Sequence, residues 1–136
     1  MAKGKDEPSV MVPTPLIEVW ESILMVPIVG ILDTARAKQI IESILERLSQ
    51  VRTDVVIISV GGISAVDTKT ASHLIRACHA IRLMGTEAIL TGIRPDVATT
   101  LVDLGIDLSN IVTFNTMHEG LEYAFKKTGW KVERSK

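Results

Sequence analysis

The residues of this sequence that could do chemistry gather between positions 60 and 73, in the stretch VGGISAVDTKTASH. Gly61 and Gly62 are followed by small hydroxyl side chains, and Asp67 stands directly before Thr68. The stretch follows an apolar run typical of a buried strand and precedes apolar positions at helical spacing. A strand-to-helix turn of this composition can cradle a phosphate, present a nucleophile or offer a hydroxyl for modification.

A nucleotide-binding loop is the first of these three interpretations, and the glycine spacing argues against it. Dinucleotide-binding and P-loop proteins need the patterns G-x-G-x-x-G and G-x-x-x-x-G-K-[ST], because the glycines let the backbone approach the phosphates closely. Neither pattern occurs in the chain. We therefore expect no bound dinucleotide, no P-loop nucleotide and no cofactor.

An enzymatic nucleophile is the second interpretation, and it needs a base and an oxyanion site beside it. His73 lies five residues after Thr68, which places it on a different face of a helix. Ser64 lacks the second glycine of a nucleophile elbow. His79 and His118 bring neither paired carboxylates nor metal-ligand spacing. The sequence therefore predicts no catalytic residue and no metal site, and it does not favour an enzyme.

Modification of Thr68 is the third interpretation, and a simple helix cap competes with it. Free backbone N–H groups and the helix dipole favour negative charge at a helix start, and a phosphate adds about −1.5 to −2 charges there. Asp67 would repel that phosphate, or it could orient the hydroxyl. Asp and Thr are common N-caps, so the residues alone favour the cap.

The composition is that of one ordinary globular domain. The 136 residues are 46% apolar and 23% charged, with a net charge of −1 and no basic excess of the kind that nucleic-acid binding requires. The longest apolar run, residues 23–32, is too short to span a bilayer, and the polar N-terminus lacks the apolar core of a signal peptide. We expect a cytoplasmic protein that binds neither nucleic acid nor membrane. The lone Cys78 falls among apolar helical positions and is expected to be a buried thiol.

Strands and helices alternate along the chain, which predicts an α/β fold. The element order is β-β-α-β-α-β-α-β-α, and we expect a mixed β-sheet with packed helices. The strand at 23–32 is nearly all apolar and is expected to be buried on both faces, with Pro27 at a bulge or an edge. The expected strands are 16–20, 23–32, 55–60, 87–93 and 111–114. The expected helices are residues 34–50, one that starts at Thr68 and is closed by Gly85, a short one with Pro95 in its first turn that is ended by Gly105, and a last one with a capping box at Thr116 and Glu119.

Three segments follow from this pattern. Residues 1–11 are expected to be a disordered tail, 12–129 the folded domain and 130–136 a C-terminal tail. Trp20 and Trp130 are expected to pack at the edge of the domain, because no aromatic partner is placed to sandwich a ligand.

The stretch VDT and its flanking strand and helix, together with LTGIRPDVATTLVDLGIDL at 90–108, resemble the STAS domains of anti-sigma-factor antagonists. Within that family, the chain is most similar to the stressosome scaffold proteins of the RsbR and RsbS type. The resemblance runs from about Val12 to Gly129. It implies the STAS (SpoIIAA-like) fold and a regulatory function rather than a catalytic one.

The resemblance also implies which residues are modified. In such proteins a switch serine/threonine kinase phosphorylates a residue at the start of the second helix, and a PP2C-type phosphatase reverses the modification. On this chain the acceptor is Thr68, directly after Asp67. A second acceptor follows the GIRP segment; Thr100 is favoured, although the adjacent Thr99 leaves the register open. The expected partner-binding residues are Asp67, Thr68, Thr100 and Arg94, which either fixes the turn before the third helix or contacts a partner.

The function implied is that of a phosphorylation-regulated stressosome scaffold, or anti-sigma-factor antagonist. Such a protein joins other STAS proteins as a homo- or hetero-oligomer and sequesters the switch kinase in stress signalling. The alternative is a ligand- or nucleotide-binding STAS module without a kinase partner. RsbR-type proteins carry an N-terminal sensor domain, whereas only a short tail precedes Leu16 here. We therefore expect either a sensorless variant or a fragment of a longer protein.

Overall fold

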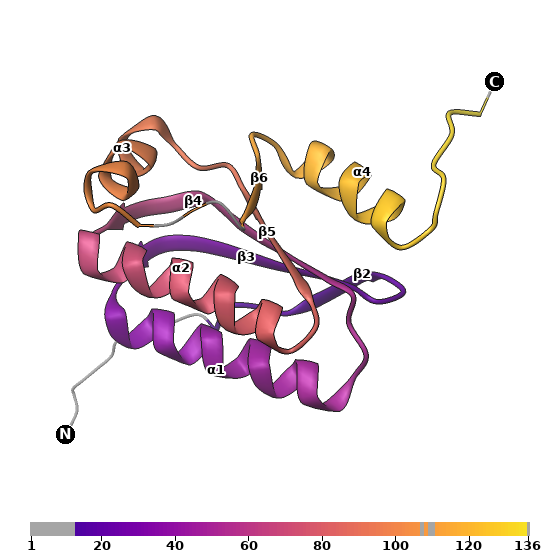
Figure 1. The fold of residues 1–136 in the computed structure, drawn as a ribbon, viewed down its shortest axis with the longest axis horizontal. Helices are drawn as coiled ribbons and strands as arrows, with labels where there is room; N and C mark the ends of the chain where they lie inside the picture. Colours follow the sequence, from indigo (N-terminus) through magenta and orange to yellow (C-terminus); the bar gives the residue numbers. More distant parts are fainter. Residues whose placement is uncertain (1–12, 107, 109–110, 136) are drawn as a thin grey trace.

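Four helices and five strands make up the described part of the chain, which a computed structural model gives for residues 13–106, 108 and 111–135 (Figure 1). The predicted N-terminal tail, residues 1–11, lies outside the described residues. In chain order the elements are β2 (Ile17–Trp20), β3 (Ile23–Leu32), α1 (Thr34–Gln50), β4 (Val55–Val66), α2 (Thr68–Leu83), β5 (Glu87–Thr91), α3 (Pro95–Asp103), β6 (Val112–Phe114) and α4 (Met117–Lys127).

The strands form one mixed sheet in the order β2-β3-β4-β5-β6. β2 pairs with β3 in the antiparallel direction, and the three remaining pairs are parallel. A helix connects the two strands of each parallel pair, as parallel pairing requires. The predicted element order and mixed sheet are confirmed.

Helices cover both faces of the sheet, and the central strand shows how the sequence arranges this. Val56 and Ile58 of β4 pack in the core under α1, α2 and α3, whereas Val55 and Ile57 pack in the smaller core under α4 (Figure 1). Alternate side chains of a strand point to opposite faces, so a continuous apolar run fits a strand covered on both sides. Cys78 is fully buried as predicted, and burial raises the pKa of its thiol to about 12.

β4 is longer than the sequence predicted. The strand was expected to end at Val60 and give way to a glycine turn, whereas it continues to Val66. Val60 and Ile63 both belong to the core under α1 to α3, and Val66 packs against that core. Their spacing of three breaks the two-residue period of a regular strand, which is why this stretch resembled a turn in the sequence.

Two β-bulges in β4 cause this irregular spacing. β3 advances two residues from Pro27 to Val29 while β4 advances three, from Ser59 to Gly62. A second register shift of the same kind follows between Gly30 and Ile31. Each bulge adds one residue to β4 and increases the local bend of the strand. Pro27 therefore lies beside a bulge, which was one of its two predicted placements.

The far end of β3 corrects a second expectation. The strand was predicted to be buried on both faces, but Val29 and Ile31 are 60% and 68% exposed. α4 packs against the beginnings of β4 and β5, around Ile57 and Ile89, and does not extend over the other end of that face. β5 is also shorter than predicted and ends at Thr91.

The two tryptophans pack at the edge of the domain, as predicted. The Trp20 ring meets Trp130 edge-on with centroids 5.5 Å apart, and it meets Phe125 in the same way at 5.8 Å. The backbone N–H of Trp130 donates to the carbonyl of Phe125 at 2.8 Å. Trp130, the first residue of the predicted C-terminal tail, thus lies against the folded domain.

Candidate phosphoacceptor and partner-binding site

The start of α2 is built by a single linking residue. Asp67 alone separates β4 from α2 and is the N-cap of the helix, and its Oδ1 accepts the backbone N–H of Thr70 at 2.8 Å. Thr68 is the first helical residue, and its side chain is exposed. The cap is therefore Asp67, so capping does not occupy the Thr68 hydroxyl.

The Asp67 carboxylate is held in its charged form. Hydrogen bonding from the Thr70 backbone N–H, and after it from the Thr70 side chain, lowers the pKa of Asp67 below its ordinary value of 3.8. The nearby Lys69 adds a smaller electrostatic attraction. Asp67 therefore supplies one negative charge beside the Thr68 hydroxyl at neutral pH.

A hollow of about 210 Å3 lies where the end of β4 meets the starts of α2 and α3. The carboxyl ends of neighbouring parallel strands meet at one edge of a sheet, so the loops that follow β4 and β5 lie close together. Three of the predicted site residues, Asp67, Arg94 and Thr100, line this hollow together with Ser64, Ala65, Val66, Ala71, Asp96 and Val97. Thr68 follows Asp67 in the chain and is not one of the lining residues.

Arg94 stands at the N-cap position of α3, with Pro95 as the first helical residue. Its Nε lies 3.6 Å from Asp96 Oδ1 in an ion pair, and 39% of its side chain is exposed. Exposed pairs of this kind contribute at most about 1 kcal/mol. The guanidinium is therefore weakly held at the edge of the hollow, in reach of a partner.

The neighbouring Thr99 and Thr100 differ in position. Each hydroxyl donates to the backbone carbonyl four residues earlier, Thr99 to Pro95 at 2.9 Å and Thr100 to Asp96 at 3.0 Å. Thr100 is half-buried and lines the hollow, whereas Thr99 is exposed and does not. The structure thus brings Thr100, and not Thr99, together with Asp67 and Arg94.

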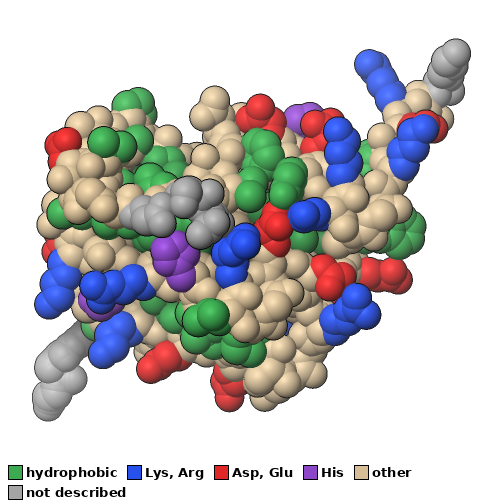
Figure 2. All heavy atoms as spheres, viewed as in Figure 1, with side chains coloured by type: hydrophobic (Ala, Val, Ile, Leu, Met, Phe, Trp, Pro, Cys, Tyr) green, Lys and Arg blue, Asp and Glu red, His purple; other side chains and the backbone are tan. Residues whose placement is uncertain are grey.

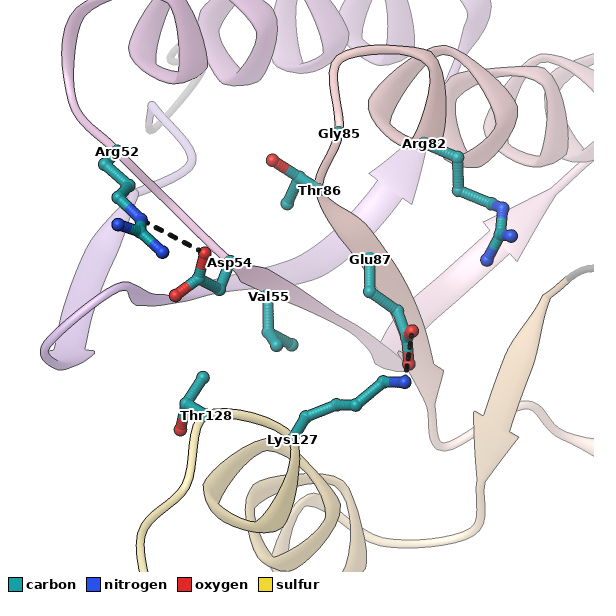
Figure 3. A pocket seen from close by; sticks show the side chains of 9 residues that line it. All are labelled: Arg52, Asp54, Val55, Arg82, Gly85, Thr86, Glu87, Lys127 and Thr128. Atoms are coloured by element: carbon teal, nitrogen blue, oxygen red, sulfur yellow. Dashed lines mark hydrogen bonds and ion pairs between the residues drawn. The ribbon is translucent and has the colours of Figure 1, made fainter.

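A second hollow, of about 570 Å3, lies at the opposite edge of the sheet, where β4 and β5 begin and α2 and α4 end (Figure 3). Arg52 Nε lies 3.4 Å from Asp54 Oδ1, and Lys127 Nζ lies 3.7 Å from Glu87 Oε1. Arg82 and Lys127 belong to the last turns of α2 and α4, where cations stabilise the negative end of the helix dipole. The helix dipoles and the two ion pairs thus explain why Arg52, Arg82 and Lys127 lie around this hollow. The sequence reasoning had not found this hollow, because its residues come from distant segments.

The Glu87 carboxylate also changes the pKa of the neighbouring Tyr123. The Glu87 side chain close by, with burial as a smaller cause, raises the pKa of Tyr123 to about 12. Tyr123 therefore stays protonated at neutral pH.

Residues 13–106, 108 and 111–135 offer neither a metal-ligand cluster nor a membrane-spanning helix. No group of three or more His, Cys, Asp or Glu side chains is placed there to hold a metal ion. No helix in that part of the chain combines the length and apolar character needed to cross a membrane.

Sequence comparisons decide the family. A family model of the STAS domain matches residues 14–120. The chain belongs to the STAS domain family. It is 46% identical over 118 residues to the RsbT co-antagonist protein RsbRA of Bacillus subtilis, a match that covers 87% of this chain and 43% of that protein. RsbRD, a second RsbT co-antagonist protein of that organism, is 34% identical over 119 residues, covering 88% of this chain and 41% of its own length.

Solved structures agree with this assignment. RsbS of Moorella thermoacetica is 27% identical and superposes with a TM-score of 0.74, covering 86% of this chain and 98% of its own. A chain from a structure described as the molecular architecture of the stressosome gives 26% identity and a TM-score of 0.69, over 85% of this chain and 99% of its own. The STAS fold and the resemblance to the RsbR and RsbS type are confirmed. The chain spans less than half the length of the two RsbT co-antagonist proteins.

Proposed function

We propose that this STAS domain is a phosphorylation-controlled scaffold module of the stressosome type, which binds a switch serine/threonine kinase of the RsbT type in the cytoplasm. It acts by binding rather than by catalysis. The observation that carries the proposal is the exposed Thr68 hydroxyl at the first residue of α2, beside the hollow that unites Asp67, Arg94 and Thr100. The similarity to proteins named RsbT co-antagonists supports the identity of the partner.

Phosphorylation of Thr68 would change the charge of this surface without unfolding the helix. A phosphate adds about −1.5 to −2 charges beside the single charge of Asp67. The free N–H groups and the positive dipole end of α2 favour that added charge. Like charges facing each other across an interface cost several kcal/mol. The phosphate therefore alters kinase affinity, and a PP2C-type phosphatase restores the hydroxyl.

Thr100 is proposed as the secondary acceptor. Its modification requires the hydroxyl to leave the Asp96 carbonyl, in a hollow that already holds the Asp67 and Asp96 carboxylates. We therefore expect Thr100 to accept phosphate more slowly than Thr68. Phosphopeptide mapping checks this: phosphate on Thr99 alone moves the site by one residue, and phosphate on neither removes the secondary acceptor.

Association with like or related STAS domains completes the proposed scaffold role. Val29 and Ile31 leave part of one sheet face apolar and uncovered, which is compatible with such contacts. Sedimentation velocity at micromolar concentration should show complexes, either of this chain alone or with an RsbS-type partner. A monomer in both experiments contradicts this part of the proposal.

The central test is phosphate transfer from the RsbT-type kinase of the same source. After incubation with kinase and Mg-ATP, intact-mass spectrometry should show one added phosphoryl group, and fragment spectra should place it on Thr68. An unmodified chain under conditions in which the kinase modifies an RsbS-type control contradicts the proposed function.

A ligand-binding module is the second candidate function, and the hollow between Arg52, Arg82 and Lys127 is the observation that favours it (Figure 3). Calorimetry with nucleoside triphosphates, compared with the same titration of the kinase, separates the two functions. Heat from the nucleotide and none from the kinase favours the ligand-binding module.

A further inference from the structure

The hollow beside Thr100 brings together one cation and two carboxylates. Arg94 is the only basic side chain among the described residues that line it, and Asp67 and Asp96 are the acidic ones. α3 itself contains Asp96 and Asp103 and no basic residue. Figure 2 shows no blue side chain over α3 on this face of the molecule, whereas blue side chains gather toward the starts of α1 and α2. An anion formed in this hollow therefore has Arg94 as its opposite charge.

The needs of α3 do not explain the arginine at this position. Arg94 stands at the N-cap of the helix, where the dipole disfavours a cation, and its side chain makes no capping hydrogen bond. Its ion pair with Asp96, at 3.6 Å, joins two partly exposed side chains, and water screens pairs of this kind strongly. The guanidinium of Arg94 can therefore exchange Asp96 for a stronger partner at little cost.

Asp96 contacts both Arg94 and Thr100. Its carboxylate forms the ion pair with Arg94, and its backbone carbonyl accepts the Thr100 hydroxyl at 3.0 Å. Thr100 is four residues after Asp96, so the two side chains lie on the same face of α3. The Thr99 hydroxyl donates to the carbonyl of Pro95 instead, and Thr99 does not line the hollow. Phosphate on Thr100 is thus formed beside Asp96 and its arginine partner, whereas phosphate on Thr99 is not.

We propose that Arg94 is the residue that binds the phosphate of phosphorylated Thr100. The phosphoryl group comes from ATP in the kinase reaction and replaces the hydroxyl proton, which is released. The phosphate then repels the Asp96 carboxylate on the same helix face and offers the guanidinium a stronger, bidentate partner. Arg94 therefore leaves Asp96 and pairs with the phosphate. The inference rests on the proposed role of Thr100 as an acceptor and adds the residue that holds its phosphate.

The exchange of ion pairs gives the two proposed acceptors different effects. Thr68 does not line the hollow, so phosphate on Thr68 adds its charge to the exposed surface. Phosphate on Thr100 is partly neutralised by Arg94, and it draws the guanidinium away from the solvent-facing edge of the hollow. Modification of Thr100 thus rearranges charges within the domain, between the N-cap of α3 and its second turn.

The test measures the ionisation of the phosphate itself. Phosphothreonine is installed at position 100 by genetic-code expansion, so no kinase is needed, and phosphorus NMR follows its second pKa, which is about 6 without a neighbouring charge. Wild type is compared with Arg94→Gln and with Arg94→Lys, which keeps the charge without the bidentate geometry. One control is Arg52→Gln, because Arg52 forms a similar exposed pair with Asp54, at 3.4 Å, on the opposite edge of the sheet. The second control carries phosphothreonine at position 99 in place of 100. Urea unfolding first shows that every variant is folded.

We expect Arg94→Gln to raise the second pKa of the phosphate at position 100 by at least about 0.5, because the cation that favours the doubly charged phosphate is lost. Arg94→Lys should give an intermediate value, and Arg52→Gln should match wild type. With phosphate at position 99, Arg94→Gln should have a much smaller effect. A merely structural role of Arg94 would not produce a shift at one position alone.

The outcomes separate this inference from the proposed function. An unchanged pKa in Arg94→Gln, or an equal shift at positions 99 and 100, overturns the role of Arg94 and leaves Thr100 as an acceptor. Phosphopeptide mapping after the kinase reaction that finds no phosphate on Thr100 removes the acceptor, and the role of Arg94 with it.

Discussion

α1 and α2 begin in the same way and differ in what they present to solvent. Each helix follows an aspartate and starts with a threonine, Asp33-Thr34 in one and Asp67-Thr68 in the other. In both, the aspartate Oδ1 accepts a backbone N–H at 2.8 Å, from the residue three positions later. Thr68 is nevertheless exposed, whereas Thr34 is half-buried, and its Oγ1 lies 3.2 Å from the Oγ1 of Thr70.

The difference shows that a local motif does not by itself define an acceptor. Asp-Thr at a helix start satisfies the free N–H groups of either helix equally well. The packing between α1 and α2 then engages one hydroxyl and leaves the other accessible. Thr70, which is fully buried, is the residue that makes this distinction.

The largest expected effect comes from removing each hydroxyl in turn. Thr68→Ala should abolish most of the phosphate that the RsbT-type kinase transfers, because the accessible acceptor is gone. Thr34→Ala should leave incorporation close to wild type, because the Thr34 hydroxyl is engaged with Thr70. Intact-mass spectrometry after the kinase reaction measures both. Substantial phosphate on Thr34 in the wild-type protein contradicts the comparison.

Removing the N-cap carboxylate of α1 or of α2 should lower the stability of the protein to a similar degree. Asp33→Ala and Asp67→Ala each delete a carboxylate that accepts a backbone N–H at 2.8 Å. Each should lower the free energy of unfolding by about 0.5–2 kcal/mol, measured by urea denaturation. Only Asp67→Ala should also change phosphate transfer to Thr68. Equal changes in phosphate transfer would show that Asp67 acts only through stability.

A smaller effect is expected from Thr70→Val, which keeps the shape of the side chain and removes its hydroxyl. The change removes the contacts of this hydroxyl with Thr34 Oγ1 and with the Asp67 carboxylate, and the loss of a side-chain hydrogen bond costs about 0.5–1.5 kcal/mol. Thr68→Val, at an exposed position, should change stability by less than about 0.5 kcal/mol. Urea denaturation of the two variants measures the contrast, and equal values would mean that the Thr34–Thr70 contact contributes nothing.

The element order could be predicted because buried strands and amphipathic helices have different periods. Apolar runs such as Val55 to Ile58 show a strand buried on both sides, and Gly85, with a φ of +86°, ends α2 as its position in the sequence predicted. Local patterns suffice for such features. They failed where two bulges disrupt the period of β4, because the pattern then resembles a turn.

The site could be predicted only in part, because some of its features depend on contacts between residues far apart in the sequence. That a helix starts near Thr68 follows from neighbouring residues, and the N-cap could have been either Asp67 or Thr68. Which threonine is accessible depends on a contact between Thr34 and Thr70, 36 residues apart. The association of Asp67 with Arg94 and Thr100 came from family resemblance, because it depends on two loops that meet only in the folded sheet. The second hollow had no sequence signal at all.

The smallest effect concerns the charge of the N-cap of α2. Because hydrogen bonding lowers the pKa of Asp67 in the folded state, the unfolded chain takes up its proton first as the pH falls. The stability that the charged Asp67 contributes is thus present above its ordinary pKa of 3.8 and is lost as the pH falls through the lower folded value. Asp67→Asn keeps a cap acceptor without the charge. At neutral pH the variant should unfold at slightly less urea than wild type, and the gap should close well below pH 3.8, whereas Thr68→Ala, which retains Asp67, should follow the wild-type pH course. A gap that is constant over the whole pH range would mean that the hydrogen bonds from Thr70 do not favour the ionised carboxylate, and that α2, like α1, is simply capped.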